Sequence, residues 1–316
     1  MRRYLVTGGA GFIGSHLVRA LLSQDNFVRV LDNFSTGKMG NLADLLGSPQ
    51  AQRLEIIKGD IRDPEKIAEA VRGIEVVFHE AAFVSVAESM EKPQECFNTN
   101  ITGTSALFEA ARSAGVRRIV IASSAAVYGD SNDLPLAENT RTRPLSPYAL
   151  SKQVGEMLGA LYTRSFGLEV AALRYFNVYG PRQSPDSAYA AAIPIFMKCL
   201  RDKRPPTVFG DGSQTRDFVF VDDVVRANLV AADHPSAPGL VMNVCSGSGT
   251  SLLDLLRLMS GLFPDSPGYQ RGEQRAGDIL NSVGSPFYAE QQTGFRIQTS
   301  LNDGLKQTAD WIKASN

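Results

Sequence analysis

The chain has 316 residues, of which 43% are hydrophobic and 21% are charged, and its formal net charge is −1. This composition is typical of a globular protein with one large or two closely packed domains, and the balanced charge disfavours binding to nucleic acid or to an anionic membrane. Three widely separated cysteines and only three histidines argue against a disulfide framework and against a metal site. No apolar run reaches the roughly 20 residues of a membrane span, and the chain starts directly with a strand, which leaves no room for a signal peptide. We therefore expect a cytoplasmic protein.

Short apolar runs alternate with amphipathic stretches in the first half of the chain. Strands are predicted at residues 4–6, 28–31, 54–57, 76–78, 118–122 and 170–173, and helices at 12–22, 65–71, 100–114 and 145–166. Alternation of this kind predicts an α/β fold with a Rossmann-type, doubly wound parallel sheet and helices on both faces.

Prolines break this rhythm after about residue 174. We expect a helix at 188–201, strands at 207–209, 217–221 and 241–244, a helix at 222–232 and a final helix at 301–313. Residues 1–173 would then form a nucleotide-binding domain. Residues 174–316 would form a smaller substrate-binding domain, of which about 217–245 is expected to return to the first sheet.

A glycine-rich loop follows the first predicted strand. Gly8, Gly11 and Gly14 form a G-x-x-G-x-x-G pattern, in which the first glycine permits a tight turn, the second lets the backbone approach a pyrophosphate and the third lets the next helix pack on the strand. Asp32 ends the second strand, where an acidic residue binds the ribose diol of NAD and would repel the 2′-phosphate of NADP. The pattern therefore predicts NAD. Asp60, after the third strand, is placed to accept the adenine amino group, and a plain turn is the alternative there.

Three residues form a candidate catalytic set. Ser124 ends the fifth predicted strand, at the edge where parallel sheets bind ligands. Tyr148 and Lys152 are spaced i, i+4 on the following helix, so their side chains share one face. A lysine ammonium and an oxidised nicotinamide within about 4–6 Å would favour the phenolate of a tyrosine, whose pKa is ordinarily near 10. Tyr148 is then a candidate base for a substrate hydroxyl, to which Ser124 can hydrogen-bond.

Several motifs together resemble the extended short-chain dehydrogenase/reductase superfamily. They are the loop at 7–14, His79-Glu80-Ala81-Ala82, Asn100, Ser124, Tyr148 with Lys152, and Arg174-Tyr175-Phe176-Asn177-Val178-Tyr179-Gly180-Pro181. Within this superfamily the chain is similar, nearly end to end, to the UDP-galactose and UDP-N-acetylhexosamine 4-epimerases. The resemblance implies that Tyr148 takes the proton of the sugar 4-hydroxyl while C4 passes hydride to NAD. The hydride then returns to the other face of a transient 4-keto sugar.

The resemblance also implies the residues of each site. Those for the cofactor are Gly8, Gly11, Phe12, Ile13, Gly14, Asp32, Asn33, Ser35, Thr36, Gly37, Asp60, Ile61, Ala81, Ala82, Asn100, Ser123, Tyr148, Lys152, Tyr175 and Val178. Those for the UDP-sugar are Val84, Ser85, Ser124, Tyr148, Asn177, Ala191, Ala192, Thr207, Phe209, Arg216, Arg275, Asp278 and Ser282. Arg216, expected in a loop, and Arg275 would neutralise the diphosphate, and a surface ion pair is the alternative for each.

Side-chain size indicates which sugar the site admits. In the resembling family, a bulky residue near the position of Ser282 restricts the site to UDP-glucose and UDP-galactose, whereas a small one admits an N-acetyl group. Ser282 and Ala191 are both small, so we expect interconversion of UDP-GlcNAc and UDP-GalNAc, with UDP-Glc and UDP-Gal as an additional candidate pair. Val84 stands where some members have lysine, and Ala126 where others have threonine or serine.

Three alternative functions differ from this one at particular residues. A 4,6-dehydratase usually needs an Asp-Glu pair just after the strand-five residue, where this chain has Ala125 and Ala126. A UDP-glucuronate 4-epimerase or decarboxylase remains an alternative, although such relatives often carry arginine where this chain has Ser184. A non-catalytic NAD-binding sensor is a distant alternative, because such proteins typically lose the tyrosine that is kept here as Tyr148.

The resemblance further implies a homodimer, because family members usually pair two helices of each subunit into a four-helix bundle. The predicted helices at 100–114 and 145–166 would supply it. Their apolar faces could equally belong to the core of one subunit.

Overall fold

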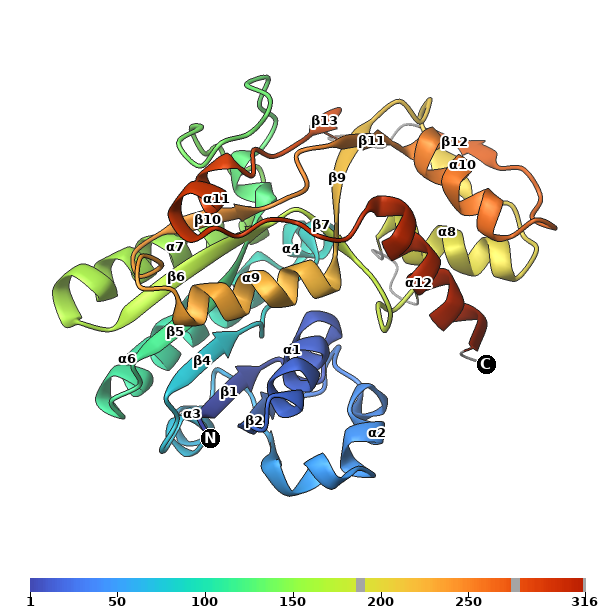
Figure 1. Ribbon diagram of the computed structural model, residues 1–316. Coiled ribbons are helices and arrows are strands. Elements are labelled where there is room, and N and C mark those ends of the chain that lie inside the picture. Colours follow the sequence, from blue (N-terminus) through green and yellow to red (C-terminus); the bar gives the residue numbers. More distant parts are fainter. Residues whose placement is uncertain (186–190, 274–278, 315–316) are drawn as a thin grey trace.

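A seven-stranded parallel sheet forms the centre of the larger part of the molecule (Figure 1). The computed structural model describes residues 1–185, 191–273 and 279–314, and the elements given below lie within them. The strand order is β10-β6-β5-β4-β1-β2-β3. The strands are β1 Arg3–Thr7, β2 Phe27–Asp32, β3 Leu54–Lys58, β4 Val76–His79, β5 Arg118–Ser124, β6 Glu169–Tyr175 and β10 Val241–Val244. All neighbouring pairs run parallel, which confirms the predicted Rossmann-type, doubly wound sheet.

Helices cover both faces of this sheet. They are α1 (Phe12–Ser23), α3 (Pro64–Val71), α6 (Thr104–Ser113), α7 (Pro147–Phe166) and α9 (Val221–Asp233). Because successive strand residues point to opposite sides, Val6 packs with α1 and α9, whereas its neighbour Leu5 packs with α3, α6 and α7. Within the described ranges, we find no helix that combines the length and the apolar character needed to cross a bilayer.

Two of the predicted helices begin differently from expectation. α7 starts at Pro147, slightly later than predicted, because the Ser146 hydroxyl caps it by accepting a hydrogen bond from the Ala149 N–H (3.1 Å). The helix predicted at 100–114 is not continuous. Instead, α5 (Pro93–Phe97) leads through a π-helical turn, Asn98–Gly103, into α6. This wider turn carries Asn100, and π-helical turns occur frequently at functional sites.

The rest of the chain forms two smaller sheets with three helices packed around them (Figure 1). One sheet contains β7 (Asn177–Tyr179), β9 (Thr215–Phe220), β11 (Gly249–Ser251) and β13 (Asn281–Ser282), and the other pairs β8 (Thr207–Phe209) with β12 (Gln270–Gly272). The helices are α8 (Ala192–Arg201), α10 (Leu252–Leu262) and α12 (Leu301–Ala314). Shorter helices elsewhere are α2 (Ala43–Leu46), α4 (Val86–Glu91) and α11 (Phe287–Thr293).

Only part of the segment expected to return to the first sheet does so. β10 pairs with β6 and α9 packs on the main sheet, but β9 pairs with β7, β11 and β13 instead. Its side chains explain the difference. Phe218 and Phe220 pack in the core of α8, α10 and α12, whereas Val219 between them packs in the core of the main sheet. β9 therefore joins the two cores rather than extending the large sheet.

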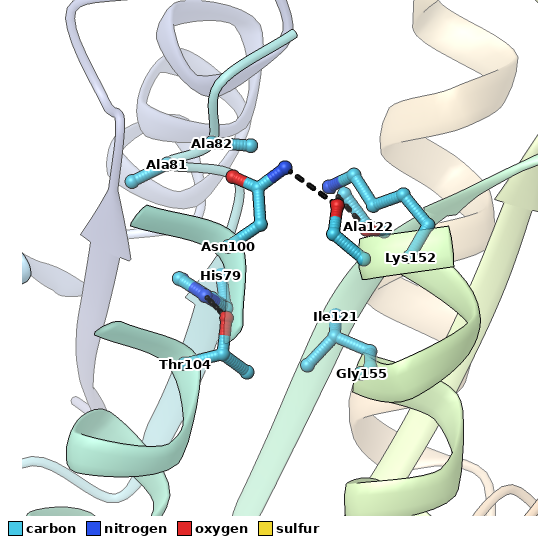
Figure 2. Close-up of a pocket in the computed structure, with 10 residues that line it drawn as sticks. His79, Ala81, Ala82, Asn100, Thr104, Ile121, Ala122, Lys152 and Gly155 are labelled. Carbon is cyan, nitrogen blue, oxygen red and sulfur yellow. Dashed lines mark hydrogen bonds between the residues drawn. The ribbon is translucent and has the colours of Figure 1, made fainter. Parts of the chain in front are cut away.

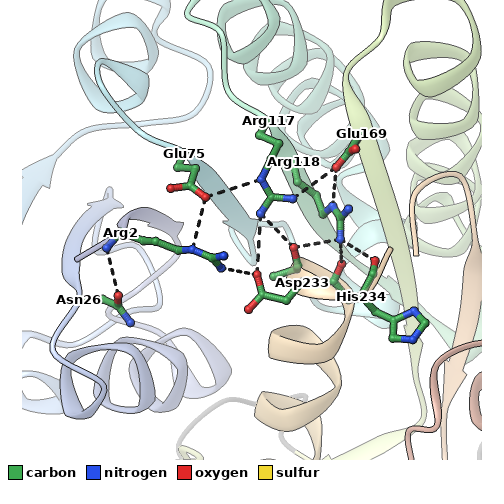
Figure 3. A network of polar contacts seen from close by, with 10 residues as sticks. Arg2, Asn26, Glu75, Arg117, Arg118, Glu169, Asp233 and His234 are labelled. Atoms are coloured by element: carbon green, nitrogen blue, oxygen red, sulfur yellow. Dashed lines mark hydrogen bonds and ion pairs between the residues drawn. The ribbon is translucent and has the colours of Figure 1, made fainter. Parts of the chain in front are cut away.

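A network of charged side chains ties the amino ends of the strands to α9 (Figure 3). The buried Arg118 guanidinium donates to the carbonyl oxygens of Ala231, Ala232 and His234 at 3.1, 3.0 and 2.8 Å, and to the Glu169 carboxylate at 2.7 Å. These carbonyls lie at the end of α9, where helix acceptors lack intrahelical donors. The network stabilises α9 at the sheet edge opposite to the one where the predicted site residues gather.

Candidate active site

The glycine loop after β1 has a backbone geometry that favours glycine. Gly8 has a φ of +70°, and its N–H donates to the Leu31 carbonyl (2.8 Å), which ties the loop to β2. A Cβ at Gly14 would lie 2.2 Å from the Gly8 carbonyl oxygen, and a Cβ at Gly8 would lie 2.7 Å from the Ala81 nitrogen. The loops after β1 and β4 therefore touch. This is the point where the strand order reverses, and doubly wound sheets bind ligands there.

Helix α1 begins directly at this loop. Gly11 is the N-cap, and no side chain in the described part of the chain caps the helix. The first turn, which includes Phe12 and Ile13, has no acidic residue. The N–H groups and the partial positive charge of a helix N-terminus suit a pyrophosphate. The loop and the helix start therefore fit a dinucleotide.

Asp32 is buried at the end of β2 and is held by two backbone donors. Its Oδ2 accepts from the Ala10 N–H (2.9 Å) and its Oδ1 from the Phe34 N–H (2.8 Å). Burial raises the pKa of Asp32, and these two hydrogen bonds oppose the shift. A Cβ at Gly37 would lie 2.9 Å from both carboxylate oxygens, so glycine keeps this space open. The fixed carboxylate suits a ribose diol. The other predicted residues of this loop are Asn33, Ser35 and Thr36.

The Asp60 carboxylate already accepts four hydrogen bonds from the protein. Arg62 donates from its N, Nε and Nη2 at 2.9, 2.8 and 2.7 Å, and Asn33 donates from Nδ2 at 2.8 Å. The Arg62 guanidinium holds the pKa of Asp60 well below its usual range. Because a carboxylate has about four acceptor positions, an adenine amino group would have to displace one of these donors. The neighbouring Ile61 is buried beneath Gly103. The adenine contact stays a prediction.

Ser124, Tyr148 and Lys152 come together at the carboxyl edge of the sheet. The Lys152 Nζ lies 5.7 Å from the centre of the Tyr148 ring and donates to the Ala122 carbonyl at 2.8 Å. The Ser124 hydroxyl accepts from the Ala126 N–H at 3.2 Å, and it acts on the Tyr148 phenol by lowering its pKa. The structure thus unites the three residues that the motif spacing selected.

The protonation of this pair depends on burial as well as on charge. Burial raises the pKa of the Tyr148 phenol, and the hydrogen bond with Ser124 opposes the shift. Burial lowers the pKa of Lys152 to about 8, while Glu80 and Cys96 act in the opposite direction. Desolvation therefore dominates at Tyr148, and the groups of the protein do not by themselves favour its phenolate. The positive charge of an oxidised nicotinamide would act against this desolvation.

A small cavity of about 10 Å³ lies between Lys152 and the loop after β4 (Figure 2). Its lining consists of His79, Ala81, Ala82, Asn100, Thr104, Ile121, Ala122, Ser151, Lys152 and Gly155. Asn100 accepts from the Phe83 N–H (2.7 Å) and donates to the Phe83 carbonyl (3.0 Å) and the Ser151 hydroxyl (2.9 Å). It therefore holds this loop against α7, so the predicted cofactor residues Ala81 and Ala82 lie beside Lys152.

His79, for which no role was predicted, lines this cavity. Its Nδ1 and Nε2 are hydrogen-bonded to the hydroxyls of Thr7 and Thr104 at 2.7 and 2.9 Å. Burial lowers the pKa of His79 to about 3. A neutral histidine therefore links β1, β4 and α6 directly under the site.

A buried ion pair also escaped the sequence-based reasoning. Arg174 donates from Nε and Nη2 to the two carboxylate oxygens of Glu156, both at 2.8 Å, and the Ser123 hydroxyl donates to Glu156 at 2.5 Å. The Ser123 side chain, predicted to contact the cofactor, is thus engaged with Glu156. Glu156 follows Lys152 at i, i+4, and this shared helix face could have marked Glu156 as a residue close to the site.

A larger cavity of about 580 Å³ lies among β7, β9 and α8. Six predicted substrate residues and one predicted cofactor residue line it, namely Asn177, Ala191, Ala192, Thr207, Phe209 and Arg216, with Val178. Arg216 lies in β9 rather than in a loop. The lining also includes Ile195 and Cys199, which the sequence-based reasoning missed although they follow Ala192 at helical spacing. The volume suits a small organic ligand.

The remaining predicted residues have other surroundings. The Ser85 hydroxyl caps α4 by accepting from the Glu88 N–H (3.0 Å), and its neighbour Val84 is 58% exposed. Ser282 pairs with Arg216 across β13 and β9. Arg275 and Asp278 lie outside the described residues.

The chain is similar to known proteins over its whole length. A UDP-glucose 4-epimerase of Mycolicibacterium smegmatis is 38% identical over 317 residues, which cover 98% of each chain. A solved UDP-N-acetylglucosamine 4-epimerase of Methanobrevibacter ruminantium, in complex with UDP-N-acetylmuramic acid, has a TM-score of 0.94 at 34% identity and covers 100% of this chain and 99% of its own. A solved UDP-glucose 4-epimerase of Thermus thermophilus, in complex with NAD, has a TM-score of 0.89 at 36% identity and covers 99% of this chain and 100% of its own.

Residues 4–245 match the NAD dependent epimerase/dehydratase family. The matched segment contains the glycine loop, Asp32, the three catalytic candidates and the whole seven-stranded sheet apart from the first residue of β1. The loop geometry, the fixed carboxylate and the end-to-end similarity agree with this match, and the chain therefore belongs to the NAD dependent epimerase/dehydratase family, whose cofactor is NAD.

Proposed function

We propose that the protein is a UDP-sugar 4-epimerase whose preferred substrates are UDP-GlcNAc and UDP-GalNAc. The observation that carries the proposal is the cavity of about 580 Å³ lined by six of the predicted UDP-sugar residues. The strand beside the one that ends at Ser124 leads directly into a strand that lines this cavity. Ser124 is paired with Tyr175 across β5 and β6, and Asn177, which lines the cavity, follows in β7.

Small side chains support the preference for an N-acetylated sugar. Ala191 lines the cavity, and Ser282 stands beside Arg216 in the paired strands β13 and β9. A bulky residue at position 191 would take up cavity volume that an acetamido group needs, and one at position 282 would stand beside Arg216, which lines the cavity. The similarity to a UDP-N-acetylglucosamine 4-epimerase supports the same choice, and the similarity to UDP-glucose 4-epimerases keeps that sugar pair as an additional candidate.

Each residue of the site would have its own role in the reaction. Tyr148 accepts the proton of the 4-hydroxyl and later returns it, while Ser124 orients this hydroxyl and Lys152 stabilises the phenolate. NAD, when bound, supplies the acceptor and donor of hydride at C4. Arg216 offsets the charge of the diphosphate. The apolar walls of the cavity, such as Phe218, exclude water from the 4-keto sugar.

Turnover of five UDP-sugars tests the proposal. The purified enzyme should have its highest kcat/KM for UDP-GlcNAc and UDP-GalNAc, with lower values for UDP-Glc, UDP-Gal and UDP-glucuronate. A preference for UDP-Glc would contradict the proposed sugar, and a preference for UDP-glucuronate would support the uronate alternative. Tyr148→Phe should lower kcat at least about 100-fold while UDP-sugar binding persists, because only proton transfer is removed.

Ser282→Tyr tests the role of side-chain size directly. It should lower kcat/KM for UDP-GlcNAc by roughly tenfold or more relative to UDP-Glc, because the added ring competes with the acetamido group for space. Ser23→Tyr, at the exposed end of α1, is the matched control and should leave the ratio unchanged. An unchanged ratio in Ser282→Tyr would remove this argument for the N-acetylated substrate.

We also propose that α7 contributes to a homodimer. Leu150, Met157 and Leu161 are 41%, 65% and 48% exposed and follow one another at i, i+7 and i+11, so they form one apolar face. Light scattering should give twice the chain mass for the wild type and a single chain mass for Met157→Glu combined with Leu161→Glu. Leu258→Glu, on an exposed face of α10, should stay dimeric. A wild-type protein with the mass of one chain would contradict the dimer.

A further inference from the structure

The buried ion pair between Glu156 and Arg174 has no part in the proposed chemistry, although it lies on the helix that carries Tyr148. Both charged side chains are 6% exposed. Because an α-helix rises 1.5 Å per residue, Glu156 lies about 12 Å, or about two turns, farther along α7 than Tyr148. The pair also includes the hydroxyl of Ser123, the residue directly before Ser124 in β5. It therefore connects α7 with the end of the strand that carries a catalytic candidate.

Apolar packing does little to fix the first half of α7. In the part of the chain that the structure describes, the large apolar side chains of α7 that pack in the core are Leu158 and Tyr162, both in the second half of the helix. The first half instead approaches the sheet with a small residue, since a Cβ at Gly155 would lie 3.7 Å from the Ile121 Cδ1 of β5 (Figure 2). Helices are held in place by side chains that interlock with their neighbours, and few do so here.

Single polar contacts also hold this half of the helix. The Ser89 hydroxyl accepts a hydrogen bond from the Tyr148 N–H at 3.2 Å, and the Lys152 Nζ donates to the Ala122 carbonyl at 2.8 Å. The first is one hydrogen bond between neutral groups. The second comes from a flexible side chain of four methylene groups, which can reach the same carbonyl from more than one position of the helix. Neither contact fixes α7 along β5.

Glu156 makes three directed contacts with two strands. Its Oε1 accepts from the Ser123 hydroxyl at 2.5 Å and from the Arg174 Nε at 2.8 Å, and its Oε2 accepts from the Arg174 Nη2 at 2.8 Å. A bidentate pair of guanidinium and carboxylate is stronger than a neutral hydrogen bond and restricts the geometry more. Ser123 and Arg174 are themselves paired across β5 and β6. The carboxylate is therefore bound to two neighbouring strands at once.

The Arg174 side chain is held from its other sides as well. Its Nη1 donates to the Glu138 carbonyl at 3.3 Å, and its guanidinium lies 4.7 Å from the centre of the Tyr128 ring. Tyr128 in turn donates from its hydroxyl to the Asn243 Oδ1 at 2.7 Å, which connects it to β10. The partner of Glu156 thus has little freedom to follow a movement of α7.

We propose that Glu156 is a positioning residue for the catalytic set: its contacts with Ser123 and Arg174 fix α7 on the carboxyl ends of β5 and β6. The place of Tyr148 relative to Ser124 then depends on these contacts. The consequence for turnover rests on the proposed function, because it is proton transfer by Tyr148 that needs this placement. The consequence for the placement of α7 does not rest on it.

A pair of substitutions separates positioning from stability. Glu156→Gln leaves the Arg174 charge buried without its counter-charge, so both the urea midpoint and kcat should fall. Glu156→Met combined with Arg174→Met removes both charges and keeps similar side-chain volumes, and such replacements of buried ion pairs are often neutral for stability. The urea midpoint of this double variant should therefore return close to the wild-type value, which also covers the case in which Glu156→Gln does not fold.

The kinetics of the double variant decide the role of Glu156 in turnover. Its kcat should stay roughly 100-fold below the wild-type value, because apolar side chains supply no directed contacts and a misplacement of about 1 Å is enough for such a loss. Its KM for UDP-GlcNAc should change by less than about threefold, since the larger cavity lies among β7, β9 and α8. If kcat recovers together with the urea midpoint, the pair is only structural and the proposal is overturned.

Glu169→Gln is the matched control. It breaks the ion pair of Glu169 with Arg118 (2.7 Å), which joins the opposite, amino ends of the same strands β5 and β6. This variant should lower the urea midpoint and leave kcat unchanged. A fall in kcat like that of the double variant would show that any weakening of this strand pair impairs turnover, and it would overturn the specific role of Glu156.

Crystal structures of the wild type and of the double variant, both with NAD, measure the placement of α7 without turnover. After superposition on the seven-stranded sheet, the first half of α7 should be displaced by roughly 1 Å in the variant, and the distance between the Tyr148 and Ser124 side-chain oxygens should change. A helix that keeps its wild-type place, or a displaced helix with unchanged kcat, would overturn the proposal. If the wild type turns over none of the five UDP-sugars, the proposed function fails, and the displacement still decides whether Glu156 positions α7.

Discussion

Replacing Gly14 by alanine should weaken NAD binding through a single steric contact. The new Cβ would lie 2.2 Å from the Gly8 carbonyl oxygen and 2.8 Å from the Gly9 Cα. Both neighbours are backbone atoms, so no side chain can rotate out of the way. Real Cβ contacts essentially never fall below 3.0 Å, and the start of α1 must therefore move away from the loop by roughly 1 Å.

The size of the effect follows from two opposing contributions to stability and one to binding. Overpacking of a close-packed site costs about 1–3 kcal/mol, and alanine recovers about 1 kcal/mol through its helix propensity. We therefore expect the free energy of unfolding to fall by up to about 2 kcal/mol. NAD affinity should fall by roughly 10- to 100-fold, because a displaced N–H donor loses a hydrogen bond to a charged pyrophosphate that is worth about 1.5–3 kcal/mol.

Calorimetric titration of cofactor-stripped protein with NAD, together with urea unfolding, measures both quantities. Gly261→Ala is the matched control, because Gly261 lies in α10 and no neighbouring atom comes within 4 Å of its added Cβ. That variant should gain up to about 1 kcal/mol in unfolding free energy and bind NAD normally. Wild-type NAD affinity and stability in Gly14→Ala would refute the role assigned to this contact.

Three further predictions concern buried charge. Burial lowers the pKa of His79 to about 3, so between about pH 6.5 and pH 3 the unfolded state binds one proton more than the folded state. In this window the free energy of unfolding should fall by about 1.4 kcal/mol for each unit by which the pH is lowered. Urea unfolding of His79→Gln should lack this component, and an unchanged pH slope would contradict it. Glu156→Gln should lower the free energy of unfolding by about 3–5 kcal/mol because it leaves the buried Arg174 charge unpaired, whereas Asp265→Asn, from an exposed ion pair, should change it by less than about 1 kcal/mol. Asp32→Ala should raise the NADP/NAD affinity ratio roughly tenfold in titrations of both cofactors, because a like charge facing the 2′-phosphate is removed. An unchanged ratio would exclude Asp32 as the discriminating residue.

The large sheet could be predicted because buried parallel strands appear as short, continuous apolar runs between helical patterns. The same criterion found β9 and the three-residue β8, but not β7, β11, β12 or β13, because strands of two or three residues show little periodicity to detect. It also could not decide which sheet β9 joins. That depends on Phe218 and Phe220 meeting α8, α10 and α12, and on Val219 meeting the main core, all of which are distant in sequence.

The catalytic candidates could be predicted because their chemistry is encoded in local spacing. Gly8 to Gly14, Tyr148 to Lys152 and the strand-end Ser124 each need only a strand or a helix to be placed correctly. The hydrogen bonds from Asn228 to the Tyr175 hydroxyl and from Tyr175 to the Glu80 carboxylate have no such signal. Tyr175 lies 95 positions away from Glu80, and Asn228 lies a further 53 along the chain.

The sequence by itself determined the α/β order, the NAD-binding loop and the identity of the three residues that meet at the sheet edge. The tertiary structure decided how those residues are protonated. Burial raises the pKa of Tyr148 and lowers that of Lys152, and the Tyr175 hydroxyl donates to the Glu80 carboxylate. The physical reason is that desolvation and charge pairing depend on which distant segments close around a side chain, and no local spacing of residues specifies that.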